Sequence, residues 1–159
     1  MGDSVDDERA VEQANAEFYA AFEAVDYDRM TNVWAGGPYA ASVTCVHPGW
    51  TMLRGRPEVL RAWALIMANT PYIQFVLTDV NIDVHGDQAV VTCGENILTA
   101  DEDTETGFLA GGSVVTTNIF VREADAWRLW LHHGSPVLGR VQDDDEEPGP
   151  GQWAQTGWR

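Results

Sequence analysis

Apolar residues in the first part of the chain recur every three or four positions, which is the spacing of an amphipathic helix. Ser4 followed by Asp7 resembles a capping box, and the helix that it opens is predicted to end near Val25. A second, short helix is predicted over 28–34, because the run Gly36-Gly37-Pro38 breaks the pattern. The apolar face of the first helix comprises Val11, Ala14, Phe18, Phe22 and Val25.

A third helix is predicted to begin in the run Gly55-Arg56-Pro57-Glu58. Proline suits a first helical turn, and a glutamate there is favourable to the helix dipole. Pro71 marks the end of this helix. The helix offers the core a stripe that consists of Val59, Leu60, Trp63, Ile66 and Met67.

Three stretches before residue 100 have the composition of β-strands. The first covers 42–47 and stops at Pro48-Gly49. The other two, 73–84 and 88–99, are joined by the turn His85-Gly86-Asp87. Along 73–84, the alternation of apolar and polar residues changes phase between Leu77 and Val80, which indicates either a bulge or a change of the buried face.

The stretch 112–137 predicts a β-hairpin around the polar corner 123–126. Strict alternation would put Trp127, Leu129, Leu131, His133 and Ser135 on one face, and Arg128, Trp130, His132 and Gly134 on the other. Both faces carry aromatic residues, so this second arm is predicted to be a central strand covered on both sides. The two histidines at its end make that end a candidate for chemistry.

Helices gathered ahead of a meander of strands indicate an α+β domain. We predict a curved antiparallel sheet, made of the meander plus one short strand, that is packed on three N-terminal helices and leaves a pocket. The domain covers 1–139, and 140–159 is an acidic tail rich in Pro and Gly. Trp153 and Trp158 in that tail have two interpretations: incidental residues of a disordered end, or an anchor that docks on the body or a partner.

The chain has a net charge of −16, and all nine of its basic residues are arginine. Such a charge disfavours nucleic acid and anionic membrane surfaces as partners. The absence of lysine excludes Schiff-base chemistry and a P-loop. An acidic N-terminus and the lack of a stretch of about 20 apolar residues predict a cytoplasmic protein. Cys45 and Cys93 form no metal-type pair and are expected to be buried as small hydrophobes.

Several local motifs together resemble the SnoaL-like branch of the nuclear transport factor 2-like superfamily, which includes ketosteroid isomerase. They are Asp26-Tyr27-Asp28 with Val33-Trp34, Val46-His47-Pro48, the run 53–58, Thr117-Asn118-Ile119-Phe120, and Trp127-Arg128-Leu129 with His133-Gly134-Ser135. The resemblance covers about 8–137. It implies a conical, cystatin-like α+β barrel, a pocket at its wide end, a homodimer through the sheet face and no cofactor. Fold does not fix function, because members include isomerases, cyclases, dehydratases and proteins that only bind.

Ketosteroid isomerase uses an Asp base beside a Tyr and a protonated Asp. The resemblance puts the base at His47, the Tyr at Phe18 or, one residue on, Tyr19, and the protonated Asp at Thr117 or Asn118. Neither Thr117 nor Asn118 is an acid. Steroid isomerisation by that machinery is therefore not expected.

The histidines remain the candidates for catalysis. His47 suits proton transfer near neutral pH, although a strand-end histidine also serves simply to bond the backbone. His132 and His133 are adjacent on a strand, so only one of them lines the pocket. Parity taken from ketosteroid isomerase favours His132, whereas a His-x-Ser motif of other SnoaL-like proteins favours His133 with Ser135. The sequence leaves this choice open.

Other residues are candidates for holding a ligand. Asn118 would hydrogen-bond a ligand carbonyl. Glu95 is either a buried carboxyl with a shifted pKa or an exposed acid facing Arg122 or Arg128. A zinc site would require His47, one C-terminal histidine and Glu95 to converge, and we predict no metal. The pocket wall is expected to include Phe18, Trp34, Tyr39, Trp50, Trp63 and Thr117, although aromatic residues at helical spacing also serve as core.

Two functions follow from these candidates. The domain binds a small apolar molecule, or it is a cofactor-independent isomerase, cyclase or dehydratase that moves a proton on a small apolar carbonyl compound. Convergence of His47, Asn118 and one C-terminal histidine on one pocket of roughly a few hundred Å³ favours the enzyme. A pocket filled by the chain's own aromatic side chains favours binding alone.

Overall fold

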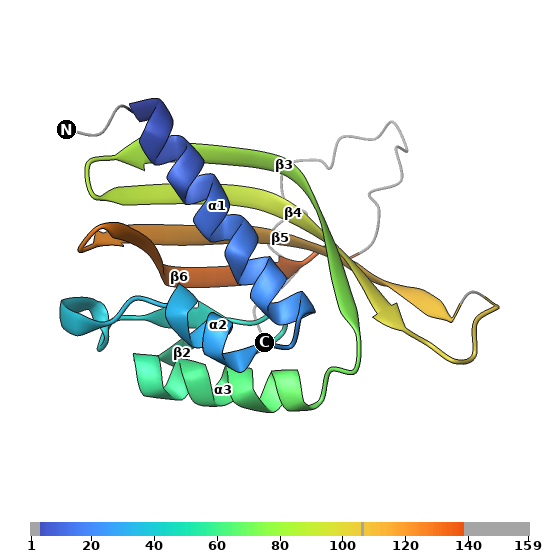
Figure 1. Cartoon of the computed structure of the whole chain (residues 1–159). Helices are drawn as coiled ribbons and strands as arrows, with labels where there is room; N and C mark the ends of the chain where they lie inside the picture. Colours follow the sequence, from blue (N-terminus) through green and yellow to red (C-terminus); the bar gives the residue numbers. More distant parts are fainter. Residues whose placement is uncertain (1–3, 106, 139–159) are drawn as a thin grey trace, which may run out of the picture.

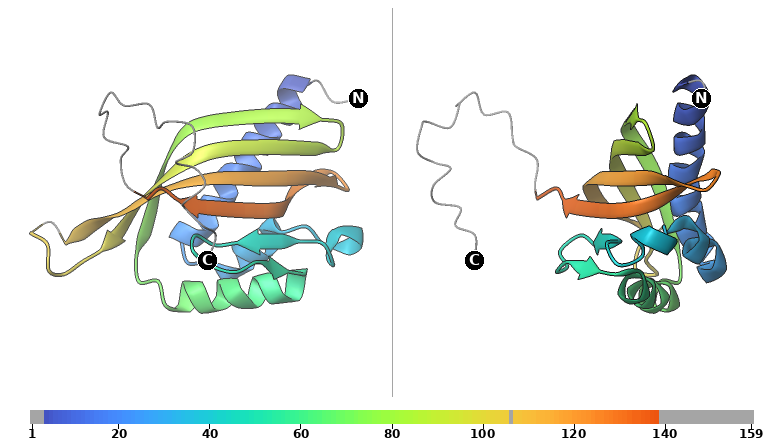
Figure 2. Two further views of the ribbon diagram at one scale, coloured as in Figure 1. Left: turned by 180° about the vertical axis from the view of Figure 1, so that it is seen from behind. Right: turned by 90° about the vertical axis from the view of Figure 1, so that its left-hand side faces the viewer.

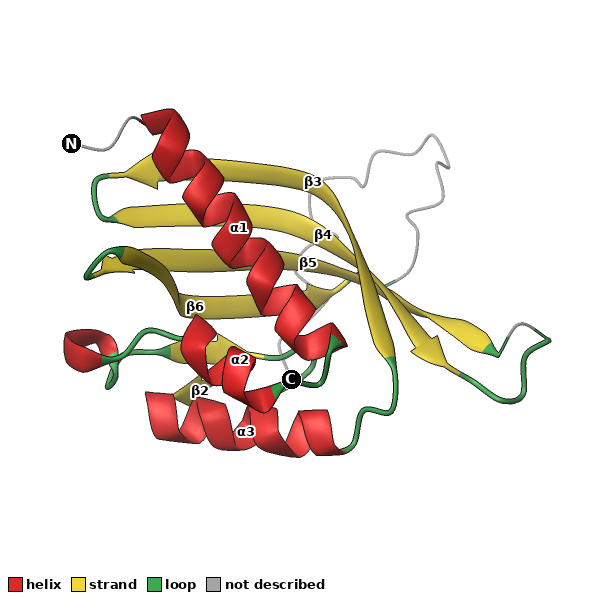
Figure 3. Cartoon of the chain, in the orientation of Figure 1, coloured by secondary structure: helices red, strands yellow, loops and turns green. Residues whose placement is uncertain are grey.

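The computed structural model describes residues 4–105 and 107–138, and the tail predicted at 140–159 lies outside them. Figures 1 and 3 show helices on a sheet. The helices are α1 (Ser4–Glu23), α2 (Tyr27–Val33) and α3 (Arg56–Ala68), with a 3-10 turn η1 (Gly37–Tyr39). The strands are β1 (Thr44–Val46), β2 (Leu53–Arg54), β3 (Ile73–His85), β4 (Gln88–Ala100), β5 (Phe108–Glu123) and β6 (Ala126–Pro136). None of the described helices is long and apolar enough to cross a membrane.

The six strands form one curved sheet in the order β2-β1-β6-β5-β4-β3. The meander from β3 to β6 is antiparallel, as predicted. β1, however, pairs with β6 in parallel, with Cys45 opposite His132, so the sheet is mixed. β2 has only two residues, too few for a periodic signal, and was not predicted. Because β2 and β3 are the two ends of the strand order, the sheet is open and not a closed barrel.

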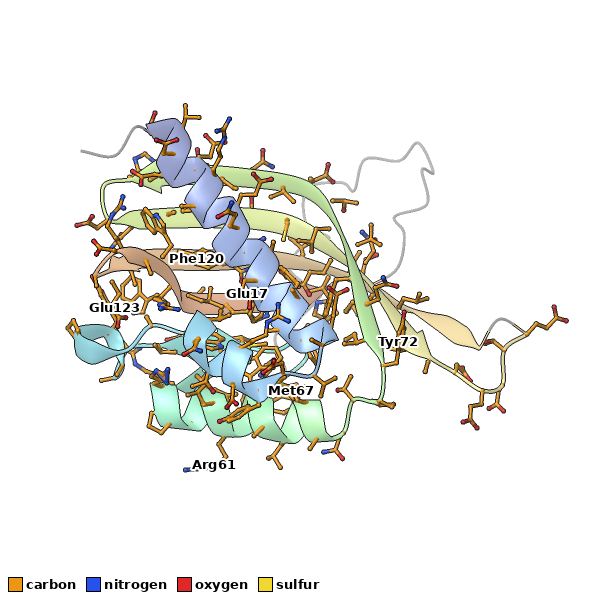
Figure 4. The ribbon with its side chains drawn as sticks, viewed as in Figure 1. Glu17, Arg61, Met67, Tyr72, Phe120 and Glu123 are labelled. Atoms are coloured by element: carbon orange, nitrogen blue, oxygen red, sulfur yellow. The ribbon has the colours of Figure 1, made fainter. Side chains whose placement is uncertain are left out.

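All three helices cover one face of the sheet, as Figure 2 shows in its right-hand view. α3 is amphipathic: Met67 is buried toward the sheet, whereas Arg61 extends into solvent (Figure 4). The Glu23 carboxylate accepts a hydrogen bond from the backbone N–H of Phe75 at 3.1 Å and so ties the end of α1 to β3. Between the layers lies an aromatic core that includes Phe18, Phe22, Trp34, Trp63 and Phe120.

The strand pairing has three register shifts, one of them between Asn96 and Leu98 where β4 pairs with β5. The shifts in β3 and β6 bear on the predictions made from the sequence. The register shift between Thr78 and Asn81 confirms the irregularity predicted in β3. A second shift was not predicted: Ile119 pairs with Leu131 but Phe120 pairs with Leu129, which leaves Trp130 as the extra residue. Beyond Trp130, the strict alternation that we predicted is therefore wrong. Trp127, Leu129, His132 and Gly134 are buried on the helix side, and His133 and Ser135 are exposed.

Gly134 lets the loop after β1 approach β6 closely. A Cβ at this position would lie 3.1 Å from both Pro48 Cγ and Val114 Cγ1. We therefore expect Gly134→Ala to destabilise the fold by about 1–3 kcal/mol, measured by urea unfolding. The exposed neighbour supplies the control, Ser135→Ala. Equal free energies of unfolding for the two variants would contradict a close approach at Gly134.

Candidate functional site

A cavity of about 70 Å³ lies between the helices and the sheet. α1 and α3 contribute aromatic walls, the sheet contributes apolar and polar side chains, and the loop after β1 contributes a histidine. The lining residues are Phe18, Tyr19, Phe22, His47, Pro48, Trp63, Ile73, Phe75, Glu95, Ile97 and His132. Two of the four candidate catalytic residues, His47 and His132, therefore meet at one cavity. Asn118 is not among the lining residues, and the volume is smaller than the few hundred Å³ that the sequence analysis associated with an enzyme.

Asn118, on β5, holds His132 in place. The amide nitrogen of Asn118 donates to Asn15 Oδ1 at 2.9 Å and to Tyr19 Oη at 3.3 Å. Its amide oxygen lies 2.6 Å from His132 Nδ1. Because that oxygen only accepts, His132 carries its proton on Nδ1, and its Nε2 has a free lone pair.

Both imidazoles at the cavity are uncharged at neutral pH. Burial, together with the smaller effects of the nearby His47 and His133, lowers the pKa of His132 to about 3. Burial also lowers the pKa of His47 to about 4. The two ring centroids are 6.4 Å apart.

Aromatic rings hold His47 in position. Its ring is edge-on to Trp50 and to Trp63, each with centroids 4.8 Å away. Cys45 Sγ lies 3.5 Å from its Nε2, and burial raises the pKa of that thiol, which keeps it protonated. His47 is thus a buried, neutral side chain with few polar contacts, whereas His132 belongs to a hydrogen-bonded network.

Glu95, on β4, is the one carboxyl among the cavity-lining residues. Its Oε2 accepts hydrogen bonds from Tyr19 Oη and Thr116 Oγ1, each at 2.6 Å. Burial raises the pKa of Glu95 despite the opposing effect of these two bonds. Burial, together with the negative charge that Glu95 carries when ionised, also raises the pKa of Tyr19. The alternative of an exposed acid is thereby excluded, because Glu95 is only 4% exposed.

Other candidate residues lie away from the cavity. His133 is exposed on the far face of the sheet, and Thr117, between the buried Thr116 and Asn118, also points to that side. Trp34 is a core residue packed against Phe18. Tyr39 packs on Trp130, and the half-exposed Trp50 covers His47 from outside the cavity lining.

The sequence analysis did not single out Asn15 or Thr116. It considered Tyr19 only as the alternative to Phe18, one residue further along the helix. A signal for Asn15 was present, because this polar residue lies on the buried face of α1, four residues after Val11. Thr116 required the register of β5 to be known. Among the described residues, no group of three or more His, Cys, Asp or Glu side chains is arranged to hold a metal ion.

The buried His47 makes the stability of the fold sensitive to acid. Its pKa of about 4 in the folded protein is below the value of 6.5 expected when unfolded, so below pH 6.5 the unfolded chain binds a proton that the folded protein does not. This stability is complete above pH 6.5 and is lost as the pH falls toward about 4. His47→Phe keeps an aromatic ring between the two tryptophans but cannot bind a proton. Between pH 6.5 and about 4, the free energy of unfolding of this variant is therefore expected to fall by about 3 kcal/mol less than that of the wild-type protein, measured by urea unfolding.

The exposed His133→Phe is the control for loss of an imidazole. An equal change of the pH profile in both variants would show that burial is not the cause.

Comparisons with known proteins agree with this fold. Residues 11–139 match the family of SnoaL-like domains. A solved structure from Streptomyces avermitilis, described as a putative dehydratase from the NTF2-like family, is 48% identical, with a TM-score of 0.78 over 86% of this chain and 100% of that chain. A structure from Thiobacillus denitrificans, described as a putative calcium/calmodulin-dependent protein kinase type II association domain, is 32% identical, with a TM-score of 0.68 over 80% of this chain and 94% of that one.

A curated plant protein is also similar. The F-box protein SKIP8 of Arabidopsis thaliana is 26% identical over 130 residues, which are 82% of this chain and 51% of SKIP8. The chain thus spans about half the length of this relative. More distant solved structures share the cystatin-like fold. The chain belongs to the SnoaL-like domain family, within the NTF2-like superfamily.

Proposed function

We propose that this domain binds a small, mostly apolar carbonyl compound in the cavity and moves a proton on it, as a cofactor-independent dehydratase or isomerase does. One observation carries the proposal: Asn118 holds the Nδ1 proton of His132, which leaves a free lone pair on Nε2 at a residue that lines the cavity. The similarity to a protein described as a putative dehydratase supports the same class of reaction.

The cavity walls suit a small apolar ligand. Phe18, Phe22 and Phe75 supply aromatic surface, and few polar groups interrupt it. An engineered cavity of about 150 Å³ takes one benzene molecule. The volume of about 70 Å³ found here therefore suits a ligand of a few non-hydrogen atoms, and a larger one requires a side chain to move. Trp50, which is 48% exposed and packs on His47, is placed for such a movement.

In this proposal His132 is the base. Its Nε2 removes a proton from the carbon beside the ligand's carbonyl group, while Asn118 fixes the orientation of the ring. Asn118 is a positioning residue, since it acts through His132. His47 is the second neutral imidazole at the cavity and contacts the ligand from the side of β1.

The low pKa values also favour a second function, which is binding without conversion. A general base works best when its pKa is near the working pH, and the pKa values of about 3 and about 4 are well below neutrality. A ligand that is held but not converted would need only the shape and polarity of the cavity.

Deuterium exchange at carbon separates these two functions. The probe is 4-hydroxy-2-butanone, a small β-hydroxy ketone, in deuterated water with NMR detection. We expect the protein to accelerate exchange beside the carbonyl group, and His132→Asn to reduce that rate about 100-fold or more. Asn keeps a donor near the Nδ1 position but lacks Nε2, so it separates catalysis from packing.

His133→Asn removes the adjacent, exposed imidazole and is the matched control, for which we expect an unchanged rate. An unchanged rate in His132→Asn would remove His132 from the mechanism. Saturable binding of the probe by the wild-type protein, without exchange, would favour binding alone.

We also propose that the domain forms a homodimer through the outer face of its sheet. Apolar side chains remain exposed there, including Val76 (62%) and Val115 (58%). A groove of about 280 Å³ on β1, β2, β5 and β6 includes Ile119, Trp130 and Leu131. Exposed apolar surface of this kind is common at protein interfaces.

Sedimentation velocity at micromolar concentration tests the dimer. We expect a dimer for the wild-type protein and a shift toward monomer for Val115→Glu, since a buried unpaired charge at an interface is unfavourable. Leu65→Glu, at an equally exposed position on α3, is the control. A monomeric wild-type protein would contradict the proposal.

A further inference from the structure

Glu95 is a buried carboxyl without a cation beside it. The ion pairs among the described residues join Arg29 to Glu17, and Arg122 to Asp7 and Asp87; none of them reaches Glu95. The neighbours of Glu95 in the cavity wall include Phe75 and Ile97. An ionised carboxylate in such surroundings is costly unless both of its oxygens are well satisfied.

The hydrogen bonds of Glu95 are unevenly divided between its oxygens. Oε2 accepts from both Tyr19 and Thr116. No described residue donates to Oε1. A carboxylate shares its charge equally between two oxygens, whereas a carboxylic acid has one carbonyl oxygen that accepts and one hydroxyl that donates. Two donors on Oε2 and none on Oε1 match the acid, with its proton on Oε1.

We infer that Glu95 is held as an uncharged carboxylic acid and that its Oε1–H is the proton donor of the cavity, directed at an oxygen of the bound ligand. The role of proton donor rests on the proposed function, whereas the protonation of Glu95 rests on geometry alone. The ligand class is then a carbonyl compound that carries a hydroxyl group on the β carbon.

The atoms balance for dehydration of such a compound. His132 Nε2 takes the proton from the carbon beside the carbonyl group, and the electron pair of that C–H bond becomes a carbon–carbon double bond. The C–O bond at the β carbon breaks, and the hydroxyl group leaves with the Glu95 proton as water. The proton on His132 then returns through solvent to the Glu95 carboxylate, which restores both groups.

The titratable groups around Glu95 provide no compensating charge. Tyr19 faces it from α1, and Cys93 lies two residues earlier on β4. Burial raises the pKa of both, so both are neutral. His47 and His132 line the same cavity and are neutral as well, since burial lowers their pKa values. α3 and β3 present only apolar side chains there, those of Trp63, Ile73 and Phe75.

Infrared difference spectroscopy tests the protonation without any ligand. We expect the difference between wild type and Glu95→Gln in deuterated water, at about pH 6, to contain the carbonyl stretch of a protonated carboxylic acid, although an ordinary glutamate has a pKa of about 4.3. Glutamine keeps an acceptor for Tyr19 and Thr116 and a donor at the other position. Absence of the band, or its equal presence for the exposed Glu12→Gln, would overturn the inference.

Thr116→Val supplies a second, independent variant. Valine has nearly the shape of threonine but cannot donate to Oε2. Because that bond lowers the pKa of Glu95, its loss should let the acid band persist to higher pH than in the wild-type protein. A band that disappears at lower pH would contradict the assignment of Glu95.

The same Glu95→Gln protein tests the role of proton donor. With 4-hydroxy-2-butanone, we expect formation of the unsaturated ketone to fall about 100-fold or more, while deuterium exchange beside the carbonyl group stays within a few-fold of wild type. If Glu95→Gln slows neither formation of the unsaturated ketone nor deuterium exchange, Glu95 is not the proton donor. If the wild-type protein catalyses neither step, the proposed function fails, and the infrared result still decides whether Glu95 is protonated.

Discussion

The hydrogen bonds of Asn118 are the constraint on which the site depends. This fully buried amide joins three elements: it donates to Asn15 and Tyr19 of α1 and accepts from His132 of β6. A buried polar group left without partners costs about 1–3 kcal/mol, so the packing of α1 on the sheet is acceptable only in the register that satisfies Asn118. That register also fixes which atom of His132 carries a proton.

The network continues from Asn118 into the second half of the cavity. Tyr19 accepts from Asn118 and donates to Glu95, which also accepts from Thr116. α1, β4, β5 and β6 are thereby linked by polar contacts beneath a layer of aromatic rings. Burial disfavours the charged form of each titratable member of this network, although the chain as a whole has a net charge of −16. In the proposed reaction, an uncharged Glu95 and an uncharged His132 share one small cavity without forming an ion pair.

The sequence predicted the layers well because helix and meander patterns are local. The bulge in β3 was also visible as a change of apolar phase near Val80. The choice between His132 and His133 could not be made from the sequence, because it depends on the bulge at Trp130. Both faces of the strand carry apolar residues there, so the bulge does not change the alternation of apolar and polar residues. The parallel pairing of β1 with β6 joins residues more than 80 positions apart, which no local pattern encodes. Asn15, Tyr19 and Glu95 meet through the same long-range packing.

A purely structural network would be expected to satisfy its own polar atoms. The indole N–H groups of Trp34 and Trp127 lack a hydrogen-bond partner among the described residues, and both rings are buried in the core. His132 Nε2 and Glu95 Oε1 differ, because both residues line a cavity. Replacing only these two residues would leave Asn118, Tyr19 and Thr116 without hydrogen-bond partners that they have now. Replacing the whole network by apolar residues of similar volume would leave no such group, and a replacement of that kind is often neutral or stabilising. The proposed function assigns these two residues of the cavity wall to the base and the acid, and so gives a reason for two polar residues that the fold alone does not require.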